Sequence, residues 1–242
     1  MRQLLREWGP TLALATVFVL GVRTFAYAGY HVPSESMLPT LRVGDQFYAA
    51  KFAYGYSRFS GPVVLPFAEG KRFPEALPDR GDVVVVRLQG REEDLVKRVI
   101  GLPGDRVQVI AGVVHVNGEP ARRRELARFG YREQEGGVAF VTEYAETLPG
   151  GQAEHRILER TDRGPADDTP EYAVPEGHVF LMGDNRDNSL DSRFLEQIGY
   201  IPVERVLGRA DLIGFAWTGC TATDGLECPA GGWADRLFAR IR

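Results

Sequence analysis

Hydrophobic residues are continuous near the start of the chain and occur in short β-branched segments later. Residues 11–22 form a run of 12 largely apolar residues, and residues 9–29 together make a stretch of 21. A helix that crosses a bilayer needs about 20 residues. The pattern therefore predicts one transmembrane anchor over residues 9–29, preceded by a short N-terminal segment, residues 1–8.

Basic residues set the expected orientation of this anchor. Arg2 and Arg6 precede the apolar run, and apart from Arg23 the next Lys or Arg is Arg42. Because basic flanks stay on the cytoplasmic side, we expect the N-terminus in the cytoplasm and the chain beyond about residue 30 outside it.

Two other interpretations of the apolar run stay open. Its length also suits the apolar core of a cleaved signal peptide, and residues 26–28, Ala-Tyr-Ala, resemble a cleavage site. The run could also be a buried helix of a soluble protein. If the helix is an anchor, residues 26–28 are a candidate for self-cleavage between molecules.

Short β-branched segments dominate the chain beyond residue 80. Turn residues such as Leu-Pro-Gly-Asp (102–105) and Asn-Gly (117–118) separate them, which is typical of antiparallel hairpins. The pattern predicts a mainly β domain. Its expected strands cover residues 82–88, 95–100, 106–110, 113–116, 179–182 and 206–215.

Residues 121–175 differ from this pattern, since they are rich in Arg, Glu, Asp and Gly. We expect an inserted polar subdomain with hairpins of its own, between core segments 30–120 and 176–242. Its charges are expected to form a solvated face without chemistry.

Composition narrows the possible functions. The chain has 242 residues, 44% of them hydrophobic, and a net charge of −4, which gives no electrostatic signature of nucleic-acid binding. Its two cysteines, Cys220 and Cys228, have no metal-ligand spacing around them. In an oxidising compartment they are a possible disulfide.

Residues 32–41, Val-Pro-Ser-Glu-Ser-Met-Leu-Pro-Thr-Leu, offer a candidate nucleophile just after the apolar run. A serine hydroxyl needs a base within hydrogen-bond reach to accept its proton. No recognisable triad motif contains a histidine, although a Ser-His-Asp arrangement stays open. The four histidines are His31, His115, His155 and His178.

Lysine is the other base used in serine peptidases, and Lys97 has the most informative surroundings. It lies within Leu-Val-Lys-Arg-Val-Ile, where strand alternation places Leu95 and Val99 on the same face as the amine. Desolvation among apolar neighbours lowers a lysine pKa. Lys97 could therefore act as a base, or equally extend from an edge strand into solvent.

A third segment is polar and compact. Residues 183–193, Gly-Asp-Asn-Arg-Asp-Asn-Ser-Leu-Asp-Ser-Arg, follow the apolar stretch Val-Phe-Leu-Met. Asp191 and Arg193 are two residues apart, which favours an internally bonded loop that orders nearby groups.

Together these segments resemble the bacterial type I signal peptidases. The resemblance rests on the apolar run followed by Pro-Ser-Glu-Ser-Met-Leu-Pro-Thr-Leu, Arg-Gly-Asp-Val-Val-Val-Val, Lys-Arg-Val-Ile-Gly-Leu-Pro-Gly-Asp and residues 183–193. It implies a single-pass protein of the bacterial inner membrane. Its periplasmic, antiparallel β domain would remove signal peptides from exported preproteins, without a cofactor or metal.

The resemblance also assigns the catalytic residues by position. It implies that Ser36 is the nucleophile and Lys97 the general base. Ser34 would contribute its side chain, and Ser36 its backbone N–H, to the oxyanion hole. Ser189 would orient the lysine amine.

The same resemblance implies two supporting pairs, Asp191 with Arg193 and Asp184 with Arg98. The substrate would bind as an added strand beside residues 30–34 and 94–96, with small side chains at −1 and −3. The implied substrate-binding residues are Tyr30, Val32, Met37, Asp94, Leu95 and Val96.

Glu35 departs from the resemblance, since many Gram-negative members of the family have glycine at this position. Other branches have polar residues there, so the implied mechanism is unaffected. Alternative functions stay open. The chain could instead be a specialised Ser-Lys maturation peptidase, as in conjugation systems, or a non-catalytic β domain tethered to the membrane. We expect preproteins and the bilayer as partners, no nucleic acid, and a monomer near the secretion machinery.

Overall fold

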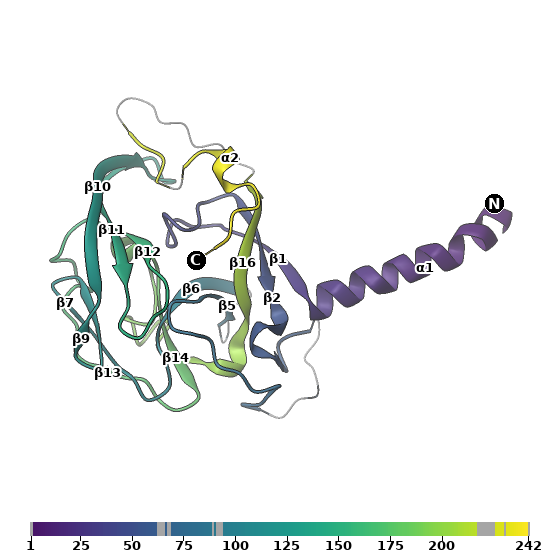
Figure 1. The fold of residues 1–242 in the computed structure, drawn as a ribbon, viewed down its shortest axis with the longest axis horizontal. Coiled ribbons are helices and arrows are strands. Elements are labelled where there is room, and N and C mark those ends of the chain that lie inside the picture. The colour runs from purple at the N-terminus through teal and green to yellow at the C-terminus, as the bar shows by residue number, and fades with distance from the viewer. Residues whose placement is uncertain are drawn as a thin grey trace.

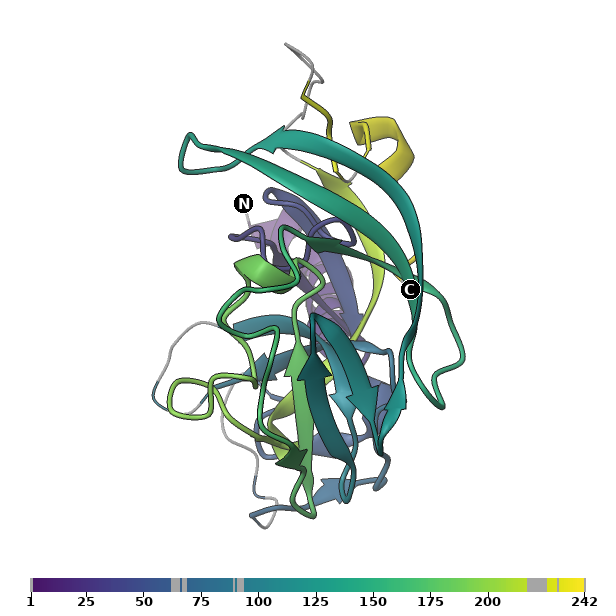
Figure 2. The same ribbon diagram turned by 90° about the vertical axis from the view of Figure 1, so that its left-hand side faces the viewer.

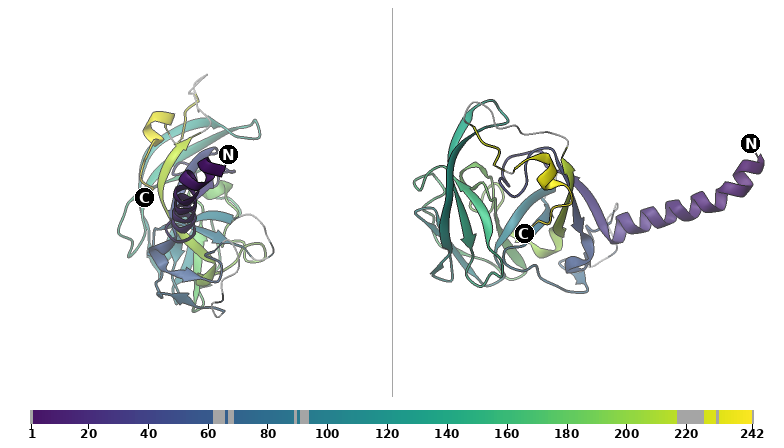
Figure 3. Two further views of the ribbon diagram at one scale, coloured as in Figure 1. Left: turned by 90° about the vertical axis from the view of Figure 1, so that its right-hand side faces the viewer. Right: turned by 45° about the horizontal axis from the view of Figure 1, so that its top comes forward.

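Helix α1 (Arg2–Phe25) projects away from a β-rich body (Figures 1 and 3). The computed structural model describes residues 2–61, 66, 69–88, 90, 94–216, 226–229 and 231–241. Several apolar side chains along the helix are exposed, including Leu12, Leu14, Val17 and Phe18. Across the part of the chain that is described, no helix has the length and apolar character needed to cross a membrane.

The helix ends at Phe25, earlier than residue 29, where the sequence pattern placed its end. Residues 27–29 instead begin strand β1 (Tyr27–His31), which pairs antiparallel with β2 (Asp45–Ala50). The predicted boundary was wrong because these backbone groups pair within a sheet. The Ala-Tyr-Ala segment lies at this transition, with Ala28 opposite Ala49.

A seven-stranded antiparallel sheet forms the body, in the order β1-β2-β16-β5-β6-β14-β15. The predicted strands over residues 82–88, 95–100, 179–182 and 206–215 are confirmed. Their bounds, with that of the short edge strand, are β5 (Val83–Arg87), β6 (Asp94–Gly101), β14 (His178–Met182), β15 (Ile201–Pro202) and β16 (Val206–Ala216).

A second sheet, in the order β13-β7-β8-β9, confirms the other two predicted strands. It packs through an apolar cluster that includes Val107, Val114 and Phe180. The strands are β7 (Arg106–Ile110), β8 (Val113–Val116), β9 (Glu119–Pro120) and β13 (Tyr172–Ala173). A small hairpin joins β3 (Tyr56–Ser57) to β4 (Arg72–Phe73).

The polar segment contains a three-stranded sheet, β10-β11-β12. Figure 2 shows β10 (Arg122–Arg132) and β11 (Val138–Thr147) as a long curved hairpin, beside which β12 (His155–Glu159) lies. Residues 172–173, assigned to the insert, instead pair with β7 of the core. The insert therefore returns to the core before residue 175.

Several charges of this segment are buried, which contradicts the expected solvated face. Glu146 and Glu159 both lie within ion-pair distance of Arg123, and Glu146 also pairs with Arg186 from the core. The arginines offset the cost of burying the charge of Glu146, whose pKa stays below its ordinary value, whereas burial raises the pKa of Glu159 to about 7. The composition alone suggested exposure because the partners are distant in sequence.

The C-terminal segment packs back on the sheet. The four-residue helix α2 (Trp233–Arg236) brings Arg236 onto the buried carboxylate of Asp45, and Arg240 forms a β-bridge with Leu212. Cys228 is disulfide-bonded. Cys220, its predicted partner, lies outside the described residues.

Candidate active site

The serine segment, residues 32–41, forms a loop between β1 and β2. Met37, Leu38 and Leu41 are buried and anchor it, while Ser36 is half-buried and Ser34 exposed. The backbone N–H of Asn185 donates to Ser36 O at 3.1 Å. The hydroxyl predicted as the nucleophile therefore lies on a loop that is held by its buried apolar side chains and by the backbone hydrogen bond from Asn185.

Lys97 lies on β6, between β5 and β14 in the large sheet. Its Nζ donates to Ser36 Oγ at 2.6 Å and to Val96 O at 3.1 Å. The residue is only 4% exposed. Leu95 and Val99 pack in one apolar cluster and Val96 in another, so the predicted alternation along the strand is confirmed.

Burial lowers the pKa of Lys97 to about 8. The carboxylates of Asp191 and Asp184 act in the opposite direction, and Arg193 adds to the lowering. An amine with such a pKa is neutral in a useful fraction of molecules near neutral pH, and its lone pair can then accept a proton.

The two other serines lie close to this pair. Ser34 Oγ is 3.3 Å from Ser36 Oγ. Ser189 packs over Gly183, and its Oγ is buried without a hydrogen-bond partner among the described residues. It makes no hydrogen bond to Lys97 within that part of the chain.

Two buried ion pairs hold the surroundings of Lys97. Arg98 contacts both carboxylate oxygens of Asp184, at 2.7 and 2.6 Å, and Thr40 also donates to Asp184. Burial favours the neutral form of Asp184, but the Arg98 guanidinium outweighs it and holds the carboxyl pKa below its ordinary value. The two pairs that the sequence suggested do form.

The second pair has the same character. Arg193 contacts both oxygens of Asp191 at 2.9 Å and donates to Arg186 O at 2.6 Å. Burial raises the pKa of Asp191, but the Arg193 guanidinium lowers it by a larger amount. The carboxylate therefore stays charged. Asp191 in turn accepts from Gly183 N, which fixes the loop of residues 183–193.

The residues implied for substrate binding divide into two groups. Asp94 and Leu95 line the same cavity as Ser36 and Lys97, with a volume of about 490 Å³. The others form an apolar cluster in which the ring of Tyr30 stacks on Phe47 at 5.6 Å. Its implied members are Tyr30, Val32, Met37 and Val96.

The structure adds positioning groups that sequence reasoning missed. Asn185 Nδ2 donates to both Glu35 O and Tyr131 Oη at 3.1 Å. Arg186 is buried on Glu146 of β11. Both residues lie in the polar segment 183–193, but the sequence contained no signal for their partners, which lie at least 40 residues away.

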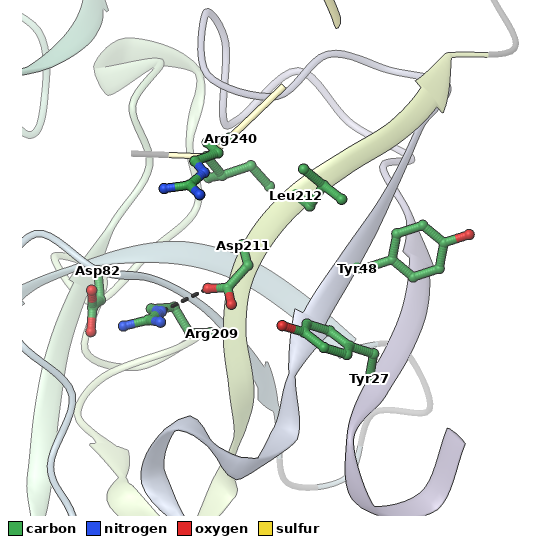
Figure 4. A pocket seen from close by; sticks show the side chains of 8 residues that line it. Tyr27, Tyr48, Asp82, Arg209, Asp211, Leu212 and Arg240 are labelled. Atoms are coloured by element: carbon green, nitrogen blue, oxygen red, sulfur yellow. Dashed lines mark hydrogen bonds and ion pairs between the residues drawn. The ribbon is translucent and has the colours of Figure 1, made fainter. Parts of the chain in front are cut away.

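A larger pocket, of about 800 Å³, lies elsewhere, between β1, β2, β16 and the C-terminal segment. Figure 4 shows Arg209 bonded to Asp211 there, with Tyr27 and Tyr48 on the other side. None of the described residues that line it is a serine, lysine, cysteine or histidine. The cavity at Ser36 is therefore the better candidate for catalysis.

Among the described residues, no histidine forms a hydrogen bond with Ser36. His155 Nε2 lies 3.2 Å from Glu146 Oε2 inside the insert, where burial lowers its pKa. No histidine lines the cavity at Ser36 within that part of the chain. The geometry favours the lysine over a Ser-His-Asp arrangement.

The chain matches one family model and relatives that have the corresponding name. The model of the family "Signal peptidase, peptidase S26" matches residues 5–215. Signal peptidase I of Pseudomonas aeruginosa is 36% identical over 88% of this chain and 74% of its own length. Signal peptidase I of Rickettsia conorii is 33% identical over 87% and 79%. A crystal structure of a signal peptidase I from Enterococcus faecalis matches with a TM-score of 0.32 at 24% identity, covering 55% of this chain and 96% of that one.

Proposed function

This chain belongs to the signal peptidase family, peptidase S26, and we propose that it cleaves preproteins by means of a Ser36–Lys97 dyad. As a family member it is a serine endopeptidase that removes signal peptides. The observation that carries the dyad is the 2.6 Å contact between a buried amine and Ser36 Oγ.

The reaction proceeds in two steps. Neutral Lys97 accepts the Ser36 proton while Oγ attacks the carbonyl carbon of the −1 residue. The lysine then gives that proton to the leaving amine of the mature protein, which leaves an acyl-enzyme ester. Water, deprotonated by the same amine, hydrolyses the ester and releases the signal peptide.

The oxyanion of each tetrahedral intermediate is stabilised by the Ser34 hydroxyl and the Ser36 N–H. Ser34 is suited to this role because its Oγ lies 3.3 Å from the nucleophile. One such donor contributes about 2.7–4 kcal/mol to the transition state. Ser189 assists by orienting the amine, a role supported by its buried Oγ, which packs against Gly183 close to Ser36 O.

The signal peptide binds in extended form, as an added strand beside residues 30–34 and 94–96. Its −1 and −3 side chains face the apolar cluster of Val32, Met37 and Val96, with Tyr30 at the −3 side and Leu95 and Asp94 at the cavity rim. We expect these walls to admit only small side chains, so that cleavage follows Ala-x-Ala-type sequences.

Helix α1 is the membrane anchor in this proposal. The exposed apolar side chains of the helix support it, and Arg2 and Arg6 near the start of the sequence support a cytoplasmic N-terminus. The catalytic core and the insert, which together make up residues 30–242, then lie in the periplasm of a bacterial inner membrane. There a Cys220–Cys228 disulfide is stable, and the enzyme acts as a monomer.

Cleavage of a purified preprotein ending its signal peptide in Ala-x-Ala tests the dyad. Ser36→Ala and Lys97→Ala should each abolish cleavage while the circular dichroism spectrum stays that of the wild type. Lys71→Ala is the matched control, since the Lys71 side chain is 69% exposed. Normal cleavage by both dyad variants would refute the mechanism and favour a non-catalytic β domain.

A further inference from the structure

The β10–β11 turn, residues 133–137, lies at the active site. The turn is closed by a hydrogen bond from Glu133 N to Gly137 O at 2.9 Å. Glu133, Gln134 and Glu135 line the same cavity as Ser36 and Lys97. The insert thus contributes one wall of that cavity, whose other wall comes from the core.

Glu35 holds this turn in place. Its Oε1 accepts from the backbone N–H of Gln134 at 2.9 Å, and its Oε2 accepts from Asn188 Nδ2 at 3.4 Å. A single carboxylate therefore connects the serine loop, the insert and the loop of residues 183–193. Its neighbour in sequence is the nucleophile itself.

Two more sets of contacts support the same docking. Asn185 Nδ2 bridges Glu35 O and Tyr131 Oη, both at 3.1 Å. Leu38 of the serine loop packs in one apolar cluster with Tyr131 and Val141 of the hairpin. The hairpin is therefore seated on the serine loop by apolar contacts, and Glu35 fixes only its tip.

The cavity lining is acidic. Among the described residues that line it are four carboxylates and one basic side chain, Lys97. Asp94 pairs with Arg87 and Glu133 with Arg160, but Glu35 and Glu135 have no Lys or Arg nitrogen within ion-pair distance among the described residues. An acidic substrate side chain near them is repelled, and a basic one attracted.

We propose that the β10–β11 turn contacts the substrate beside the scissile bond, that Glu35 positions it there, and that Glu35 and Glu135 disfavour acidic substrate residues. The inference rests on the proposed function. In an extended substrate whose −1 and −3 side chains face the core, the −2 side chain points to the other side. We therefore expect the turn to contact the substrate residues at −2, +1 and +2.

Charge selectivity is the first test. Preproteins carrying Lys or Asp in turn at −2, +1 and +2 are compared by kcat/KM. The wild type should cleave the Lys form about fivefold better than the Asp form at one or more positions, and less so at high salt. In Glu35→Gln/Glu135→Gln the ratio should fall below about twofold.

The matched control is Glu125→Gln/Glu154→Gln. Both carboxylates are exposed and paired with arginines in or beside the same sheet, and neither lines the cavity. Its Lys-to-Asp ratio should equal that of the wild type. No discrimination by the wild type, or an equal ratio in the Glu35/Glu135 variant, overturns the proposed contact.

Hydrogen–deuterium exchange tests the positioning role of Glu35. Glu35→Ala should speed amide exchange in residues 133–137 and raise KM about tenfold with a smaller change in kcat. Glu35→Gln keeps an oxygen acceptor for the Gln134 N–H and should restore slow exchange and low KM. Unchanged exchange in Glu35→Ala refutes the positioning role.

These outcomes are separable from failure of the dyad. If Ser36→Ala still cleaves, the proposed function fails regardless of the turn. If Ser36→Ala is inactive and Glu35→Ala behaves as the wild type, only the inference about the turn fails.

Discussion

Lys97 Nζ lies 2.6 Å from Ser36 Oγ, although the two residues are 61 positions apart in sequence. β6 carries the amine, and the loop between β1 and β2 carries the hydroxyl. The apolar cover that separates Lys97 from water lowers the amine pKa to about 8. Burial of Lys97 beside Ser36 thus also makes its amine a better proton acceptor near neutral pH.

The rate of cleavage should depend on pH through this amine. Because only neutral Lys97 accepts a proton, kcat/KM is expected to rise with pH and level off above about pH 8, the pKa of the buried amine. Initial rates on an Ala-x-Ala preprotein between pH 6 and 10 measure the profile. A flat profile across pH 7–9 would contradict the role of Lys97 as base.

Lys97 should also lower the stability of the folded protein. Its pKa is about 8 when folded and 10.5 as the ordinary value, so between these pH values the unfolded chain binds more protons. The free energy of unfolding therefore rises with pH across that window, by up to about 3 kcal/mol. Below pH 8 the penalty is present in full.

Lys97→Met should remove this penalty. At pH 7 we expect the variant to be inactive yet more stable by up to about 3 kcal/mol, with the advantage gone above about pH 10.5. Urea unfolding at the two pH values measures both. Lys71→Met, at an exposed site, should leave stability unchanged, and a Lys97→Met variant less stable than wild type at pH 7 would count against the argument.

Gly183 should tolerate no side chain. A Cβ there would lie 2.2 Å from Ser189 Oγ and 2.5 Å from Ser36 O. Gly183→Ala must push the loop of residues 183–193 away from the nucleophile, and a displacement of about 1 Å can cost about a hundredfold in rate. Gly29→Ala is the control, because among the described residues its Cβ would meet only the Tyr48 ring, at 3.7 Å. Equal kcat/KM for both variants would show that the close packing is unimportant.

Glu146 should be essential for stability although it lies in the insert. The Glu146 and Arg186 side chains are 0% and 1% exposed and pair with each other. Glu146→Gln leaves the Arg186 charge buried without its carboxylate, which costs about 3–5 kcal/mol. Urea unfolding should show this loss, and Glu146→Gln/Arg186→Met should recover part of it.

An exposed pair supplies the control for that experiment. Glu154 and Arg124 form an ion pair at the surface, and Glu154→Gln is expected to change stability by no more than about 1 kcal/mol. Similar losses for Glu146→Gln and Glu154→Gln would mean that the buried cluster adds nothing.

Local sequence determined the strands and the identity of the reactive residues. Arg106–Ile110 forms a strand that buries alternate side chains on a pleated surface, and Val83–Arg87 forms a strand whose first four residues are buried on both faces. The serine loop, the strand of Lys97 and residues 183–193 were each recognisable because their composition is local. Their joint resemblance to one family then indicated the function.

Only the tertiary structure decided which polar groups are buried and with whom. Glu146 lies among the charges of a polar segment, yet it is buried because Arg186 reaches it from the loop of residues 183–193. Glu35 has no expected role in the sequence, yet its carboxylate accepts a hydrogen bond from the backbone of the β10–β11 turn. The end of α1 at Phe25 likewise follows from pairing of β1 with β2. Partners of this kind come from distant parts of the chain, and hydrophobic periodicity contains no information about them.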